Sequence, residues 1–248
     1  MKRSYRRKAG SLFENSLQRL ILSEKESDIE IHYSHHVSGI RRLLLQCRRQ
    51  LTEHIKKEPA FATSYTPLSL GPEDSPIIQR MKQAAAAASV GPMAAVAGAV
   101  AEELGSHYRG MNDDLIIENG GDLYLSLATD RKVLIYAGNS PLSNQLTLSV
   151  TALSTPLGIC TSSGTVGHSH SQGNADAVVA VSPSTSLADA AATAVGNRVG
   201  SHVDIEKAIG YSQTIPGLSG VIIIAGSHVG FWGDVQLSPA KMSRPALE

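Results

Sequence analysis

The fold is decided by residues 115–125, with the sequence Leu-Ile-Ile-Glu-Asn-Gly-Gly-Asp-Leu-Tyr-Leu. Two short apolar runs flank Asn119-Gly120-Gly121, and an Asn-Gly step between such runs is the commonest signal for a tight β-hairpin. More strand-like runs recur between turn residues, at 132–137, 145–150, 175–181, 221–225 and 232–237. Because strands follow strands with few helices between them, we predict an α+β fold with mainly antiparallel sheets.

Helical patterns occur on both sides of this strand-rich part. Apolar residues recur at spacings of three and four over residues 37–55, which predicts an amphipathic helix. Residues 28–34 before it alternate between apolar and polar and are expected to form an edge strand. Ser75-Pro76 is typical of a helix start. Two more helices are predicted, at 187–199 and 204–209.

The helix that begins at Ser75-Pro76 is interrupted by Val90-Gly91-Pro92. A new helix is expected to follow and to end near Gly105. A helix start entered through a glycine presents unpaired N–H groups, which suit a phosphate, so Gly91 is a candidate ligand-binding residue. The alternative is a bend that lets two small-residue surfaces pack closely. The spacing of the residues leaves both open.

Composition predicts a globular protein. The chain has 248 residues, 42% of them hydrophobic and 18% charged, with a net charge of +0. This neutral total and an aromatic content of only 4% argue against a nucleic acid as partner. Two cysteines far apart in sequence provide neither a disulfide scaffold nor a cysteine zinc site. No run of about 18 apolar residues predicts a membrane span, and we expect a cytoplasmic protein.

We predict one domain over residues 1–246. Its N-terminal strand and helix part, residues 1–58, carries a net charge of +6 and is expected to attract the acidic core, residues 59–246. Residues 247–248, Leu-Glu, have the composition of a vector-encoded scar.

Three clusters carry possible chemistry. In the first, Gly120 and Gly121 let a ligand approach the backbone, and Asn119 and Asp122 have the groups to bond a ribose or an amide edge. A plain hairpin turn explains the same residues.

The second cluster is a run of hydroxyl and glycine residues that ends in two histidines. It contains Thr161, Ser162, Ser163, Gly164, His168 and His170. Its donors suit a phosphate, and His168 is a candidate general base. The alternatives are a polar surface loop and a metal held by the two histidines. Cys160, after an apolar run, is expected to be a small buried residue and not a nucleophile.

The third cluster lies on the predicted helix 187–199. Asp189, Thr193 and Asn197 are four residues apart and form a polar stripe on a helix otherwise rich in Ala and Val. Ser186 as N-cap with Asp189 three residues later also fits a capping box, but a capping box leaves Thr193 unexplained. A carboxylate and a hydroxyl are hard oxygen ligands that suit Mg²⁺ held together with a phosphate.

These motifs together resemble the ApbE-like proteins, the FAD-dependent protein flavin transferases. The segment 117–125 is similar to that family's Asn-x-Gly-Gly-Asp motif, 161–164 to its Thr-Ser-Gly loop, and 188–194 to its Ala-Asp-x-x-x-Thr-Ala helix, in the same order. With residues 90–98, the chain resembles most a small cytosolic branch of this superfamily. The resemblance implies a tunnelling-fold-like architecture.

The resemblance also implies a chemistry. Asp189 and Thr193 match the positions that hold Mg²⁺ beside the pyrophosphate of FAD, while FMN passes to a Thr or Ser hydroxyl of an acceptor protein and AMP leaves. The family's His-x-x-Asp-Pro-x-x-Gly segment has no counterpart here, so His168 is only the nearest candidate for the base. Other members are expected to bind or hydrolyse FAD without modifying a protein.

Two further function classes stay open. The branch also resembles proteins linked in anaerobes to sulfur assimilation into homocysteine, which would make the chain a component of that pathway. A non-catalytic interaction protein is the third possibility, and an empty or apolar pocket where the three clusters converge would favour it. The expected partners also include a second copy of the chain. The motif order predicts that Asn119, Thr161, Gly164, Asp189 and Thr193 line one cleft.

Overall fold

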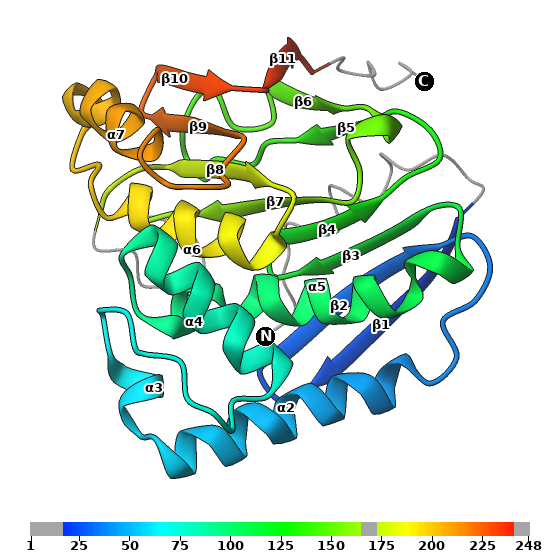
Figure 1. Ribbon diagram of the computed structural model, residues 1–248. Helices are drawn as coiled ribbons and strands as arrows, with labels where there is room; N and C mark the ends of the chain where they lie inside the picture. Colours follow the sequence, from blue (N-terminus) through cyan, green and yellow to red (C-terminus); the bar gives the residue numbers. More distant parts are fainter. Residues whose placement is uncertain (1–16, 165–172, 241–248) are drawn as a thin grey trace.

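The computed structural model describes residues 17–164 and 173–240, and Figure 1 shows their arrangement. An eight-stranded sheet runs in the order β1 (Gln18–Glu24), β2 (Ser27–Tyr33), β3 (Leu115–Asn119), β4 (Asp122–Ser126), β7 (Leu157–Ser162), β8 (Ala177–Ser182), β9 (Gly220–Ala225) and β10 (His228–Gly233). A second sheet has three strands, β11 (Gln236–Pro239), β6 (Leu146–Val150) and β5 (Arg131–Leu134). Every described strand pair is antiparallel, which confirms the predicted α+β class.

The helices cover one face of the large sheet, and the small sheet covers the other. The helices are α2 (Ile40–Lys57), α3 (Ala60–Thr63), α4 (Pro76–Ala88), α5 (Val96–Tyr108), α6 (Thr185–Gly196) and α7 (Ile205–Ser212). Short 3₁₀ turns are η1 (Pro92–Ala95), η2 (Arg109–Met111), η3 (Ala152–Ser154) and η4 (His202–Asp204). Ile117 of β3 packs in the core under the helices, whereas its neighbour Ile116 packs in the core between the sheets. This alternation follows from the two-residue period of a strand.

Three predicted elements need correction. Residues 28–34 do not form an edge strand, because β1 pairs along the outer side of β2. The predicted strand 232–237 is two strands, since Gly233 has a φ of 86° and turns the chain from β10 into the second sheet. Residues 160–162 belong to strand β7 rather than to a polar loop, because their pairing with β8 continues through Ser162.

Small residues place α6 between α5 and the sheet. A Cβ on Gly98 of α5 would lie 2.4 Å from the Thr185 carbonyl oxygen, and a Cβ on Gly158 of β7 would lie 2.4 Å from the Thr185 Cα. Both distances are below any normal van der Waals contact, so the backbones approach as closely as they do only because these positions lack a side chain. The start of α6 is thereby clamped between α5 and β7.

No single helix in the described part of the chain is long and apolar enough to span a membrane. Residues 76–88 and 92–111 reach that length and composition only as a pair, and the pair is bent by 106°.

Candidate functional site

Helix α6 is buried on every side except at two residues. Of its 12 residues, only Asp189 and Thr193 are partly exposed, and they lie one turn apart on the same face. A helix of Ala, Leu and Val is expected to be wholly buried between α5 and the sheet, so this open strip is where the packing leaves access to polar groups. The structure therefore places the two predicted metal ligands together, on the one partly open face of the helix.

Asp189 is bound by the first turn of helix α5. Its Oδ2 accepts a hydrogen bond from the Gly98 amide at 2.8 Å, and the Ala97 amide also interacts with this carboxylate. These N–H groups have no partner within their own helix, because they belong to its first turn. A carboxylate is favoured there by the helix dipole.

The alternative interpretation of Asp189, a capping box with Ser186, does not hold in the structure. Helix α6 begins two residues earlier, and its N-cap is Ser184, whose side chain accepts from the Leu187 amide at 3.3 Å. Ser186 lies inside the helix, and its hydroxyl donates to Oε2 of Glu102 at 2.8 Å. Because Ser184 caps helix α6, Asp189 is not needed to cap the helix in which it lies.

Gly91 serves close packing. It precedes η1, is buried, and a Cβ there would lie 1.7 Å from the Ser64 carbonyl oxygen. Of the two alternatives for this residue, the structure favours the packed bend. The helix start that faces a carboxylate is that of α5, several residues further on.

The Asn-Gly-Gly-Asp hairpin reaches the same turn of α5. Asn119 Nδ2 donates to the Ala97 carbonyl at 3.0 Å, and Oδ1 of Asp122 accepts from the Thr161 amide at 3.2 Å. Gly120 and Gly121 have φ angles of 75° and 111°, which make the two-residue turn between β3 and β4. The hairpin therefore joins α5, β4 and β7 beside Asp189.

Two carboxylates act on each other in this region. Burial raises the pKa of Asp189 well above its usual range, and the negative charge of Asp122 raises it further, against the opposing effect of the Gly98 and Ala97 amides. Two carboxylates that repel each other in a partly enclosed place favour a bound cation or a shared proton. In the described residues no three His, Cys, Asp or Glu side chains form a complete metal cluster, so further ligands must come from other groups.

The segment 161–164 is only partly directed toward this site. Cys160 and Ser162 lie on the helix-facing side of β7, whereas Thr161, opposite Val179, lies on the side of the small sheet. The Ser162 hydroxyl is buried and has no hydrogen-bond partner among the residues that the structure describes. Ser163 lies at the end of the strand and is partly buried. Thr161 therefore contributes to the site through its amide rather than through its side chain.

Gly164 stands at the end of the described part of this segment. A Cβ on Gly164 would lie 1.9 Å from the Gly173 carbonyl oxygen, and a Cβ on Gly173 would lie 2.0 Å from the carbonyl oxygen of Gly196 in α6. Both flanks of the intervening stretch thus meet near the C-terminal end of α6. The candidate base His168 and its neighbour His170 lie outside the described residues.

Cys160 is a structural residue. Its thiol donates to the Thr185 carbonyl at 3.3 Å. Burial, with added repulsion from Asp122 and Asp189, raises the pKa of this thiol well above its usual range. A thiol that stays protonated is a poor nucleophile, as its sequence context predicted.

Two contributors to the site were not predicted from the sequence. The Ala97 and Gly98 backbone is one, and only the Ala/Gly-rich character of 94–99 hinted at close contact there. Glu102 is the other: its Oε2 accepts from Ser184 Oγ at 3.1 Å and from the Ser186 amide at 2.8 Å, so it holds the first turn of α6. An acidic residue within an apolar helix was the available signal.

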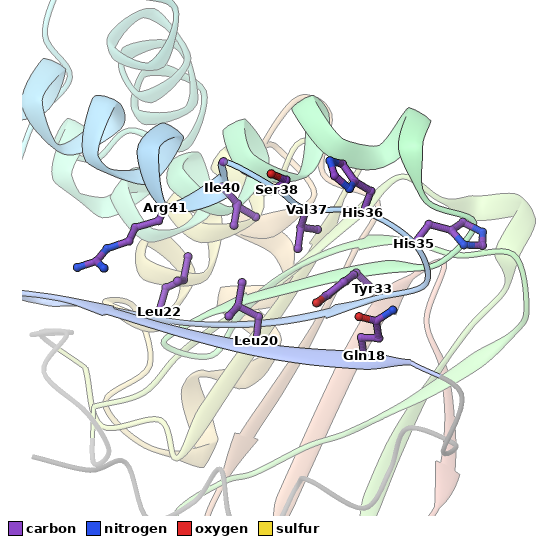
Figure 2. A pocket seen from close by; sticks show the side chains of 11 residues that line it. Gln18, Leu20, Leu22, Tyr33, His35, His36, Val37, Ser38, Ile40 and Arg41 are labelled. Carbon is purple, nitrogen blue, oxygen red and sulfur yellow. The ribbon is translucent and has the colours of Figure 1, made fainter.

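Two surface hollows lie away from this site. One of 390 Å³ opens between β1 and the start of α2, and Figure 2 shows Leu20 and Leu22 pointing toward Ile40 there. Another of 220 Å³ is lined by His107 and Tyr108, at the opposite end of α5 from the turn that holds Asp189. Neither hollow includes a residue of the three predicted clusters.

Comparison with known proteins places the chain in a family. A family model described as AbpE bacteria matches residues 11–213. A UPF0280 protein of Methanococcus maripaludis strain C7 is 42% identical over 201 residues, which make up 79% of this chain and 81% of that protein. A UPF0280 protein of Methanocaldococcus jannaschii is 34% identical over 223 residues, 88% of this chain and 91% of that protein.

Solved structures share the fold. The flavin transferase ApbE from Vibrio cholerae superimposes with a TM-score of 0.53 at 12% identity, over 91% of this chain and 98% of that chain. The flavinyl transferase ApbE of Pseudomonas stutzeri gives a TM-score of 0.57 at 12% identity, over 90% and 96% of the two chains. Together the family match and the shared fold confirm the resemblance that the motifs predicted. The chain belongs to the AbpE bacteria family, and it shares its fold with the ApbE flavin transferases of known structure.

Proposed function

We propose that this protein binds the flavin nucleotide FAD at the partly open strip of α6, where Asp189 and Thr193 would hold Mg²⁺ for the pyrophosphate. The observation that carries the proposal is the partial exposure of these two residues alone on an otherwise buried helix. The kinship with flavin transferases and the three motifs in family order support the choice of ligand.

The residues present fit a magnesium ion. Asp189 supplies a carboxylate, Thr193 a hydroxyl on the same face, and Asp122 a second negative charge close enough to raise the pKa of Asp189. Mg²⁺ commonly binds through one or two carboxylates and completes its shell with water and substrate phosphates. The lack of a third clustered acidic or histidine ligand in the described chain is compatible with that pattern. When bound, the metal would neutralise charge on the pyrophosphate.

The hairpin and strand β7 supply the other groups around the proposed ligand. Asn119 holds the Ala97 carbonyl and so keeps the first turn of α5 against Asp189. Gly120 and Gly121 leave the hairpin without side chains, and around the Cβ position of Gly121 no described atom lies within 4 Å, which leaves room for a ligand. The buried hydroxyl of Ser162 is directed to the same side of the sheet and is a further donor.

The proposed reaction is FMN transfer or its hydrolytic counterpart. A hydroxyl oxygen of an acceptor Thr or Ser, or of water, attacks the phosphorus of the FMN half. The anhydride bond to the AMP phosphate breaks, AMP leaves, and the hydroxyl proton passes to a base, for which His168 is our candidate. If no residue of the chain can accept the hydroxyl proton, the protein binds FAD but catalyses neither reaction.

Calorimetric titration with FAD tests the proposal. The wild type is measured with Mg²⁺ and with EDTA, beside Asp189→Asn and the control Asp130→Asn. The exposed carboxylate of Asp130 lies in the connection between β4 and β5 and accepts from the Ala152 amide. We expect Mg²⁺-dependent binding by the wild type and the control, and weak, Mg²⁺-independent binding by Asp189→Asn. Equal affinity in all conditions would contradict the metal role. Release of AMP or FMN in the same samples distinguishes turnover from binding.

A further inference from the structure

Among the described residues 17–164 and 173–240, strand β10 is an unprotected edge of the large sheet. It pairs with β9 on one side only, and Figure 1 shows it at the end of the sheet next to α7. Its sequence, His-Val-Gly-Phe-Trp-Gly, contains neither a charged residue nor a proline. Edge strands are normally protected by such residues, because free backbone groups invite pairing with another chain. The opposite edge strand has this protection: in β1, Arg19 and Glu24 form ion pairs with Glu30 and Arg41.

The unpaired backbone groups of β10 belong to the residues with exposed apolar side chains. The turn Gly226-Ser227 has two residues, so His228 forms the hydrogen-bonded pair that closes it, and Gly230 and Trp232 follow in alternation. The N–H and C=O groups of Val229 and Phe231 therefore face outward. Their side chains are 41% and 55% exposed, which is high for apolar residues at the margin of a core.

We propose that β10 pairs with β10 of a second copy, antiparallel about a two-fold axis at Gly230, to form a dimer with one continuous sheet. In this register Val229 lies opposite Phe231 of the second copy, and the reverse pair is equivalent by symmetry. Both are hydrogen-bonded pairs, with a β-branched and an aromatic side chain side by side, a favourable cross-strand combination. The proposal is independent of the proposed function.

Neighbouring registers are excluded by geometry. A register centred on Phe231 would need Gly233 in the ladder, but Gly233 has a φ of 86° and its carbonyl accepts from the Val235 amide. A register centred on Val229 would need Ser227, which belongs to the turn. Only the register about Gly230 uses extended residues alone.

The chemistry at the two ends of β10 does not oppose this arrangement. The first end carries His228, on which His202 stacks with ring centroids 4.2 Å apart, and the other end is followed by exposed Asp234. Antiparallel pairing places the imidazole end of one copy beside the carboxylate end of the other. The two copies of Asp234 therefore lie at opposite ends of the paired strands, and no two carboxylates are brought together.

Sedimentation velocity of the full chain over a wide concentration range tests the dimer. We expect the wild type to dimerise and Phe231→Glu to weaken dimerisation at least about tenfold, because it buries a charge in the centre of the interface. The control Leu153→Glu changes a fully exposed apolar residue elsewhere and is expected to behave as the wild type. Circular dichroism establishes that each variant is folded; if Phe231→Glu is not, Val229→Lys replaces it with the same expected result.

A charge pair tests the register. Val229→Lys combined with Phe231→Glu places Lys opposite Glu twice in the proposed dimer, and we expect it to bind at least about threefold tighter than Phe231→Glu alone. This gain should diminish at high salt. A wild type that stays monomeric at every concentration, an unaffected Phe231→Glu, or a double variant no tighter than the single one would each overturn the proposal.

Discussion

Asn119 and Asp189 bind adjacent residues of one helical turn: Asn119 Nδ2 donates to the Ala97 carbonyl at 3.0 Å, and Asp189 Oδ2 accepts from the Gly98 amide at 2.8 Å. The first residue comes from the β3–β4 hairpin and the second from α6. Both motifs, distant in sequence, are thus fixed to the start of α5, which explains how the chain assembles one site from separate segments. The geometry of the candidate site depends on the close approach of α5 and α6.

That approach predicts the effect of Gly98→Ala. The added Cβ would lie 2.4 Å from the Thr185 carbonyl oxygen and 2.7 Å from the Asp189 Cβ, so the two helices must separate. Despite the better helix propensity of alanine, we expect a loss of about 1–3 kcal/mol in the free energy of unfolding. The separation should also weaken any FAD binding.

The matched control is Gly210→Ala in α7. No described atom lies within 4 Å of the added Cβ there. The same substitution should then stabilise the protein by up to about 1 kcal/mol through helix propensity alone. Urea unfolding measures both variants, and equal stabilities would contradict the close packing of α5 and α6.

The sequence predicted the elements and the motifs better than their mutual arrangement. The hairpin at Gly120-Gly121 and the polar stripe of Asp189 and Thr193 follow from local rules, namely turn chemistry and helical period. The partner of Asp189 could not be predicted in this way, because a backbone amide carries no sequence signature. The same holds for the N-cap: Ser184 and Ser186 are equally good caps in sequence, and Glu102, from another helix, binds Ser186 within the turn.

A buried ion cluster, separate from the candidate site, predicts a second stability effect. Lys82 Nζ lies 2.8 Å from Glu58 Oε2 and 3.1 Å from Asp74 Oδ2, and the Lys82 side chain is only 2% exposed. Lys82→Met should cost about 3–5 kcal/mol, because Asp74 then remains buried without its cation. Lys57→Met removes an exposed ion pair, in which Lys57 Nζ lies 3.7 Å from Glu73 Oε2, and should change stability by less than about 1 kcal/mol. Thermal or urea unfolding distinguishes the two.

The same cluster predicts how stability depends on pH. Hydrogen bonding to Lys82 lowers the pKa of Glu58. Burial raises the pKa of Asp74, but hydrogen bonds from the Gly71 amide and Lys82 have a larger, opposite effect, so the pKa of Asp74 is lowered as well. Both carboxylates therefore stabilise the fold above their unfolded pKa values, near 4, and this contribution is lost as the pH falls. Burial lowers the pKa of Lys82, but the opposite effect of Glu58 and Asp74 is larger, so the pKa is raised overall. The stabilisation that Lys82 contributes is therefore present below about pH 10 and lost above it.

Urea unfolding from pH 2 to pH 8 measures the acid limb of this dependence. The wild type should lose stability as the pH falls below about 5, and the part due to the cluster should be absent in Lys82→Met. Parallel curves for the two proteins would show that the cluster does not determine the acid limb.

The cysteines predict a thiol reactivity. Burial, with the Glu103 carboxylate adding to it, raises the pKa of Cys47 to about 12, and the pKa of Cys160 is raised as well. At pH 8 the folded protein should react with an aromatic disulfide reagent at neither thiol, whereas the urea-unfolded chain should react at both. Leu153→Cys, at a fully exposed position, provides a positive control with one fast-reacting thiol. Fast reaction of the folded wild type would contradict the burial of both residues.

Substitution of Ser162 should affect FAD binding without lowering the stability of the fold. Its hydroxyl is buried on the side of β7 that faces α6, and no group in the described part of the chain forms a hydrogen bond with it. Burying an unsatisfied hydroxyl is unfavourable, so Ser162→Ala should leave the free energy of unfolding unchanged or raise it by about 1 kcal/mol. If the hydroxyl donates to a bound nucleotide, the same variant should weaken FAD binding by up to about tenfold, the loss of one hydrogen bond.

The control for Ser162 is Ser182, a serine equally buried in the next strand. Its hydroxyl donates to the Gly217 carbonyl at 2.9 Å and accepts from the Ser184 amide at 3.1 Å, so its bonding is complete within the protein. Ser182→Ala should cost about 1–3 kcal/mol of stability, since it leaves buried partners unsatisfied. The two serines thus differ in the sign of the stability change, which urea unfolding measures without any ligand. A destabilised Ser162→Ala with unchanged FAD affinity would mean that this hydroxyl has a structural partner and does not face the nucleotide.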